Sequence, residues 1–231
     1  MMLLAVALAG GSAKGQVYVN GSVYGGGNVG NVAGNTTVNL TSGTINDNVY
    51  GGGKGDATTA ATVGSTQVNL NQDVENTAKG CIVLGSIFGC NNINGTPLGD
   101  ATVHIFKTQN VSASQIGNPA EGEQTAKMEG HYDVTAVYGG GNLAAYMPTK
   151  ATNGSTDDDE EAFAHVIIEG CDLTSIKTVY GGGNAASTPA TKVEIKGTYE
   201  IEEVFGGGNG KDNLPNGVPN PGANVGYKAY P

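Results

Sequence analysis

A phrase of six residues, Val-Tyr-Gly-Gly-Gly-Asn, recurs along this chain and limits the folds that the chain can adopt. Three copies are complete, two carry one change, and one is looser but in the same frame. They lie at Val23–Asn28, Val49–Lys54, Ile87–Asn92, Val137–Asn142, Val179–Asn184 and Val204–Asn209. Six copies in 231 residues indicate a structural repeat, because a linker has no need of an aliphatic and an aromatic residue before each glycine run.

Each part of the phrase has a predicted role. A β-branched residue followed by Tyr or Phe is typical of a strand. Glycine adopts positive φ without steric cost and allows close backbone approach, so the triplet is expected to turn the chain and pack against neighbouring copies. In the looser copy Cys90 and Asn91 replace the second and third glycines while Gly89 stays, so the first glycine is predicted to be the strictest and the third position to need positive φ. The predicted repeat positions are Tyr24, Gly25, Tyr50, Gly51, Phe88, Gly89, Tyr138, Gly139, Tyr180, Gly181, Phe205 and Gly206.

A second pattern alternates with the phrase. Residues 36–40 alternate polar and apolar, which is the period of a half-buried strand. Later segments of this kind carry the pairs Val68/Leu70, Val103/Ile105, Val166/Ile168 and Val193/Ile195. The spacing of the phrase predicts a two-strand unit of about 25 residues, with insertions near 71–80, 107–133 and 146–163. The second insertion leaves open a degenerate coil around Gln115–Asn118, and a short helix is predicted at Pro119–Met128.

Short strands joined by glycine turns predict an all-β fold, a parallel β-helix of about six coils. Successive coils would stack about 4.8 Å apart, with inward ladders of Val, Ile and Leu forming a continuous core. A right-handed helix is favoured, since left-handed hexapeptide helices use shorter coils and stricter periods. The alternative is a stack of antiparallel hairpins with glycine loops.

The composition excludes some partners. The 39 glycines are more than twice the usual share of about 7%, while only 8 prolines and 14% charged residues argue against collagen and against a charge-driven disordered chain. The formal charge is −10, and all 11 basic residues are lysines. Nucleic acids and acidic membrane surfaces are therefore poor partners, because no basic stripe is present to displace counterions.

The start of the chain predicts export. Residues 1–9 form a short apolar run, and Ala13-Lys14-Gly15 resembles a small-residue cleavage box, so residues 1–15 are predicted to be a signal peptide and 16–231 the repeat domain. The alternative is a buried first strand. The run is too short to span a bilayer, and no other stretch could do so. Residues 223–225 look like the start of a further strand, so the chain is expected to adjoin other domains of a longer protein.

The three cysteines do not predict a disulfide framework. A strand between Cys81 and Cys90 would hold them roughly 30 Å apart at about 3.3 Å per residue. Cys81 and Cys171 both follow a glycine, but two coil spacings would separate them by about 10 Å. We expect free or buried thiols.

The repeated phrase behind a signal-like segment resembles the glycine-rich β-helical repeats of bacterial surface and adhesin-like proteins. The resemblance covers residues 17–209 and is specific for a repeat architecture rather than for an activity. It implies an exported protein, extracellular or at the cell surface.

Metal binding has two candidate segments. The run Asp157, Asp158, Asp159, Glu160, Glu161 offers the oxygen ligands that Ca²⁺ prefers, but a lone charge run is usually a solvated loop. Residues 207–215, with Asp212, match one copy of a calcium β-roll nonapeptide, although such a roll needs consecutive copies. We predict no cofactor and keep Ca²⁺ as an alternative.

Catalysis would need acids converging in one groove. Asp47, Asp73, Asp100 and Asp172 fall on different predicted coils without a paired pattern. The other titratable candidates are His131-Tyr132-Asp133 and His165, which lack the pairing of a zinc site. The outward strand residues also differ from coil to coil, so a regular ice-binding array of threonines is not predicted.

Two function classes remain. The first is a non-catalytic surface module, a stalk or adhesin whose loops present binding sites for glycans or host proteins. The second is a carbohydrate-active β-helix enzyme, a polysaccharide lyase or hydrolase. We favour the first, because the residues of the chain serve repeat geometry.

Overall fold

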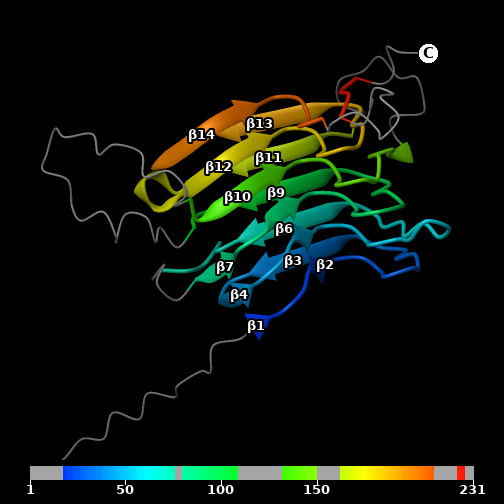
Figure 1. Cartoon of the computed structure of the whole chain (residues 1–231), viewed down its shortest axis with the longest axis horizontal. Coiled ribbons are helices and arrows are strands. Elements are labelled where there is room, and N and C mark those ends of the chain that lie inside the picture. Colours follow the sequence, from blue (N-terminus) through cyan, green and yellow to red (C-terminus); the bar gives the residue numbers. More distant parts are fainter. Residues whose placement is uncertain (1–17, 76–79, 109–131, 150–161, 211–222, 227–231) are drawn as a thin grey trace, which may run out of the picture.

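The computed structural model describes residues 18–75, 80–108, 132–149, 162–210 and 223–226 of the chain. This part is almost entirely β, with strands stacked in parallel sheets along one axis (Figure 1). A short sheet contains β1 (Tyr18–Val19), β4 (Gly43–Ile45) and β7 (Cys81–Val83). An aromatic sheet contains β2 (Val23–Tyr24), β5 (Val49–Tyr50), β8 (Ser86–Phe88), β10 (Val134–Tyr138), β12 (Ser175–Tyr180) and β14 (Glu200–Phe205). An alternating sheet contains β3 (Thr36–Leu40), β6 (Thr66–Leu70), β9 (Ala101–Ile105), β11 (Ala164–Ile168) and β13 (Thr191–Ile195).

The connectivity is that of a parallel β-helix. From β1 to β9 the chain visits the short, aromatic and alternating sheets in turn, and from β10 to β14 it alternates between the aromatic and alternating sheets. Every strand pairs in parallel with the strand one coil away. The alternative of stacked antiparallel hairpins is therefore wrong. The right-handed sense stays a prediction.

The unit contains more than the two strands expected. In the first three coils a third strand, in the short sheet, precedes the phrase. In later coils the aromatic-sheet strands lengthen instead: β10 has five residues, and β12 and β14 have six. β8 pairs directly with β10, so no degenerate coil is inserted in the stack between them. The predicted helix at Pro119–Met128 lies outside the described residues.

The core consists of ladders of identical or similar side chains. In the alternating sheet, two inward positions are aliphatic in every strand and fall in register from β3 to β13. The first ladder is Val38, Val68, Val103, Val166 and Val193, and the second is Leu40, Leu70, Ile105, Ile168 and Ile195. The predicted alternation is thus confirmed, because inward residues stack on their own kind while outward residues face solvent.

The aromatic residues of the phrase form a single stack. Adjacent rings lie 4.6–5.2 Å apart between centroids and within 11° of parallel. The stack runs through Tyr24, Tyr50, Phe88, Tyr138, Tyr180 and Phe205. Beside it, the asparagines that close the phrase bond in one direction: Asn142 to Asn92, Asn184 to Asn142 and Asn209 to Asn184. The spacing between successive coils sets the distance between neighbouring rings in the stack and between neighbouring asparagines in the row.

The triplet glycines serve close packing and not positive φ. None of them has positive φ, and neither does Asn91, so this part of the prediction is wrong. A Cβ on Gly25, Gly51, Gly89 or Gly139 would lie 2.3–2.4 Å from the carbonyl oxygen of the first glycine in the next coil. The first glycine is strict because the next coil leaves no room for a side chain there.

One large side chain enters the core from a segment assigned to the third insertion. Tyr146 is fully buried with Cys90, Ala101, Ala162 and Ala164, and its hydroxyl donates to the Gly99 carbonyl at 2.7 Å. At the register position of the two strand alanines, the other strands carry threonines that donate to glycine carbonyls: Thr36, Thr66 and Thr191. The Tyr146 ring therefore packs at the two strands in which alanine, Ala101 or Ala164, stands in place of the threonine.

A clasp closes the first insertion. Asn71 is buried and left-handed, with φ of 56°. Its side chain accepts a hydrogen bond from the Cys81 amide at 2.7 Å and donates to the carbonyls of Cys81 and Lys107 at 3.1 Å. Asn is one of the residues that tolerates this backbone region. The clasp joins the end of β6 to the start of β7.

Candidate ligand-binding face

The outward side chains of the alternating sheet form a polar face, here called the candidate face. They lie in two columns because strand residues alternate between the two sides and all five strands are in register. The first column is Thr37, Gln67, Thr102, His165 and Lys192. The second column is Asn39, Asn69, His104, Ile167 and Glu194. Beyond the strand ends follow Phe106 and Glu169.

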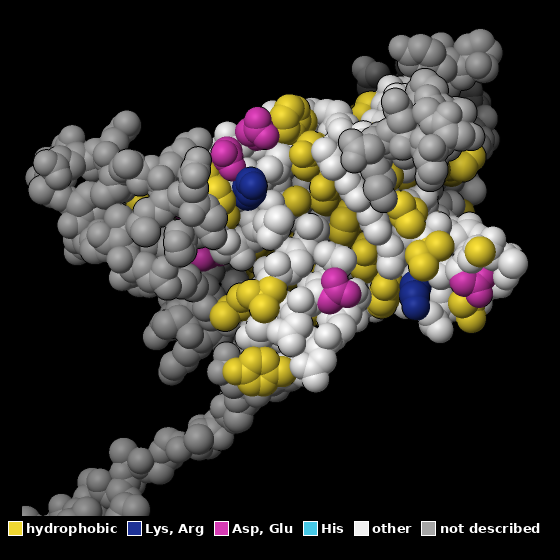
Figure 2. All heavy atoms as spheres, in the orientation of Figure 1, with side chains coloured by type: hydrophobic (Ala, Val, Ile, Leu, Met, Phe, Trp, Pro, Cys, Tyr) yellow, Lys and Arg dark blue, Asp and Glu magenta, His cyan; other side chains and the backbone are white. Residues whose placement is uncertain are grey.

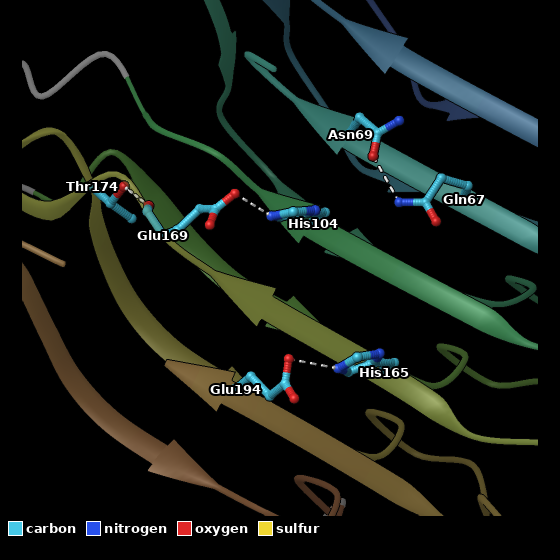
Figure 3. A network of polar contacts seen from close by, with 7 residues as sticks. All are labelled: Gln67, Asn69, His104, His165, Glu169, Thr174 and Glu194. Atoms are coloured by element: carbon cyan, nitrogen blue, oxygen red, sulfur yellow. Dashed lines mark hydrogen bonds and ion pairs between the residues drawn. The ribbon is translucent and has the colours of Figure 1, made fainter. Parts of the chain in front are cut away.

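Amides occupy the part of the face built by β3 and β6. Gln67 donates to Asn69 at 2.6 Å, as Figure 3 shows, and Asn69 donates to Asn39 at 2.8 Å. The bonds align the three amides in one row. Each of these side chains has both donor and acceptor atoms, so the row offers mixed hydrogen-bonding capacity to a ligand.

A histidine and a carboxylate pair across β9 and β11. His104 Nε2 lies 2.7 Å from Glu169 Oε1, and the two side chains point toward one another in Figure 3. The imidazole also stacks on the Phe106 ring, with centroids 3.7 Å apart. The backbone carbonyl of Glu169 accepts a hydrogen bond from the Thr174 hydroxyl at 2.5 Å, which holds the turn after β11. Ring, imidazole and carboxylate are thereby fixed side by side.

A second histidine lies one strand further along. His165 Nε2 is 3.4 Å from Glu194 Oε2, and Lys192 Nζ is 2.8 Å from Glu194 Oε1. His165 Nε2 is buried and has no hydrogen-bond partner among the described residues. Burial lowers the pKa of His165, more than the neighbouring Glu194 raises it. The Lys192 hydrogen bond lowers the pKa of the half-buried Glu194. His165 is therefore neutral at pH 7.

His165 makes stability depend on pH. Because its pKa is lower in the folded state than the unfolded value of 6.5, the unfolded chain takes up the proton first as pH falls below about 6.5. We expect the denaturant midpoint of unfolding to decrease when the pH is lowered from 8 to 5.5. The decrease should be smaller in the His165→Gln variant. An equal fall in both proteins would contradict this role of His165.

The chemistry of the face suits a hydroxyl-rich ligand. It combines amides, imidazoles, carboxylates, one ammonium group and one aromatic ring on a sheet whose three central strands, β6, β9 and β11, are paired on both sides. Such mixed polar groups beside a ring are the usual means of orienting a small polar ligand. On the side of the molecule shown in Figure 2, charged side chains are few and scattered among uncharged ones.

The predicted metal segments lie outside the described residues. This applies to Asp157, Asp158, Asp159 and Asp212, and also to His131 and to the signal-like residues 1–15. Within the ranges that the structure describes, no three His, Cys, Asp or Glu side chains gather closely enough to hold a metal ion.

The predicted acid–base candidates have separate places. Asp47 lies between β4 and β5 and accepts a hydrogen bond from Ser22 at 2.7 Å. Asp73 and Asp100 are exposed, one after β6 and one before β9. Asp133 accepts a hydrogen bond from Thr108 at 2.5 Å, at the end of the second insertion. Asp172 lies in the 3-10 turn Cys171–Leu173. Of the predicted candidates that the structure describes, only His165 lies on the candidate face.

The three cysteines are free, as expected. Cys81 and Cys90 are buried, and Cys171 is exposed. Burial raises the pKa of Cys81 to about 11, and it also raises the pKa of Cys90. Both buried thiols are therefore protonated and poor nucleophiles at pH 7.

The sequence interpretation missed His104, Phe106 and Glu169. The signal was present in the ladders, since aligning Val103 with Val166 and Ile105 with Ile168 places His104 outward and Glu169 one residue beyond β11. The contact between His104 and Glu169 runs diagonally from one coil to the next, so the spacing of these residues along the chain does not reveal it.

In the described residues, no helix has the length and apolar character needed to cross a membrane. Comparison of the chain with protein-family models, with curated proteins and with solved structures found no match.

Proposed function

We propose that this chain is an exported, non-catalytic surface module that binds glycans through the candidate face. The observation that carries the proposal is the in-register arrangement of amides, imidazoles and carboxylates beside Phe106, on a sheet whose three central strands are paired on both sides. A rigid β-helix holds these groups at fixed spacing, which lowers the ordering cost of binding an extended ligand.

The export part rests on the sequence. The apolar run at residues 1–9 and the box Ala13-Lys14-Gly15 support a secretory signal, and the repeated phrase supports a likeness to adhesin-like surface proteins. An extracellular or surface location follows from this proposal. Insertions at the coil corners would supply further contacts, to glycans or to host proteins.

The charge of the chain narrows the glycan class. A formal charge of −10 repels uronic acids and sulfated sugars. The amides and the half-buried Phe106 ring suit the hydroxyls and the apolar faces of neutral sugars. Neutral polysaccharides are therefore the expected ligands.

The second candidate is a carbohydrate-active enzyme. Two histidine–carboxylate pairs on adjacent strands, His104–Glu169 and His165–Glu194, are the observation in its favour. Such pairs can act as general acid or base. Against it, the acids at residues 47, 73 and 100 lie on different coils.

The test is isothermal titration of the chain with soluble neutral polysaccharides and, in parallel, with polygalacturonate. We expect neutral polymers to bind and Phe106→Ala to weaken binding about tenfold, because the ring and its support for His104 are lost together. Thr135→Ala is the matched control, since Thr135 is exposed on β10, in another sheet, and should bind as the parent does.

Two results would contradict the proposal. The first is the absence of binding to any neutral polymer. The second is the release of reducing ends or unsaturated products, which would establish the enzyme instead.

A further inference from the structure

Among the described residues, β14 has a neighbouring strand on one side only, and its other side resembles a contact between two coils from which one coil is missing. β14 is an edge strand of the sheet, and β2 is the other edge. Val204 and Phe205 are 47% and 41% exposed, whereas Val179, one coil earlier, is fully buried. Exposed apolar edge strands are templates for pairing with another chain.

The glycines of the last phrase lack the neighbour that the other copies have. In five coils the first glycine faces the next coil, where a Cβ would lie 2.3–2.4 Å from a carbonyl oxygen. For Gly206 and Gly207, a Cβ would meet nothing within 4 Å. Gly206 and Gly207 therefore keep a surface shaped for another coil, whereas Gly208 of the same copy packs against Ala223.

The hydrogen bonds across each junction have one direction. The amide of the first glycine donates to the aromatic carbonyl of the next coil, as Gly139 does to Tyr180 at 3.0 Å and Gly181 to Phe205 at 2.8 Å. The Gly206 amide has no acceptor among the described residues. Tyr24, on the opposite edge strand, occupies the register position whose carbonyl accepts this bond in the other coils.

The asparagine row has the matching polarity. Each asparagine Nδ2 donates to the Oδ1 of the asparagine one coil earlier, so Asn209 donates to Asn184. The Oδ1 of Asn209 is then the acceptor for an asparagine in a following coil. Asn28 closes the first phrase and is exposed. A first coil placed on a last coil would align Asn28 with Asn209, Tyr24 with Phe205, and Val23 with Val204.

We propose that a second copy of this chain stacks head to tail on the β14 edge, through its own Val23–Asn28. The contact repeats the five internal junctions in register, bond direction and ring stacking. It is heterologous, because the β2 end of one copy meets the β14 end of another, and its parallel geometry adds further copies without closure.

Sedimentation velocity over a concentration series tests the proposal. We expect the parent chain to form dimers and longer species as concentration rises. Gly206→Ala should weaken association at least tenfold, because its Cβ meets none of the described residues of its own chain but would meet the carbonyl of the incoming copy. Its melting temperature should be unchanged at a dilution that keeps both proteins monomeric. Thr135→Ala, which is exposed and far from both edges, should associate as the parent does.

Mixing the two proteins tests the polarity of the contact. Gly206→Ala keeps an intact β2 end, so it should add to the β14 end of the parent chain and block further growth. Adding it in excess should shorten the parent's oligomers. A parent chain that stays monomeric at about 100 μM, a variant that associates equally well, or parent oligomers that are unaffected by the variant would each overturn the proposal.

Discussion

Gly139→Ala is expected to destabilise the fold by more than about 2 kcal/mol, the largest effect of any single added methyl group that we predict. The new Cβ would lie 2.3 Å from the Gly181 carbonyl oxygen and 3.2 Å from the Ala164 Cβ. Neither atom belongs to a flexible side chain, so the coil itself must move. That movement stretches the bond from the Gly139 amide to the Tyr180 carbonyl.

Gly206→Ala is the matched control for this substitution. It makes the same chemical change at the same position of the phrase, but on the edge strand β14, where its Cβ meets no atom of the described residues within 4 Å. We expect its free energy of unfolding to stay within about 0.5 kcal/mol of the parent value, measured by denaturant titration at a dilution that keeps both proteins monomeric. Equal losses in the two variants would show that the glycine is needed for its backbone alone and not for the approach of the next coil.

Tyr146→Ala is expected to cost about 3–5 kcal/mol, which is typical of removing a large buried aromatic side chain. The ring is fully buried against Cys90 and three alanines, so its loss leaves a cavity that these small side chains cannot fill. The Gly99 carbonyl loses its hydroxyl donor as well. The measurement is the denaturant midpoint with its slope.

Two further variants separate the parts of this effect. Tyr146→Phe keeps the ring and removes the 2.7 Å hydrogen bond, so a loss of about 1 kcal/mol is expected. Tyr18→Ala removes an aromatic side chain that is 59% exposed and should change stability by less than about 1 kcal/mol. If Tyr146→Ala lowered the free energy of unfolding by no more than Tyr18→Ala does, Tyr146 would not be part of the core.

The aliphatic ladders were predictable because each is a local pattern repeated in sequence. Val103 and Val166 are recognisable as inward residues from their own neighbours alone, and stacking then follows from the repeat. The short sheet and Tyr146 were not predictable in this way. Tyr146 enters the core only because Ala101 and Ala164 leave room beside Cys90, and those residues are far apart along the chain.

The role of the triplet glycines was half predictable. Glycine can adopt positive φ, and it also allows a neighbouring backbone to approach closely because it has no Cβ. The sequence alone does not show which of these two properties a given position requires. At Gly51 the constraint is the neighbouring coil, whereas positive φ occurs at Gly43 and Gly55, outside the triplet. The candidate face was missed for a related reason, since His104 and Glu169 meet across coils.

The Asn71 clasp has a consequence for how the chain can change in length. Its side chain bonds both the amide and the carbonyl of Cys81, so the segment between them enters and leaves the stack at fixed points. We therefore expect residues added within that segment to leave the pitch of the helix and the register of its strands unchanged. Such a corner is a natural place to graft a foreign peptide, because the graft would be displayed on the rod without taking part in its construction.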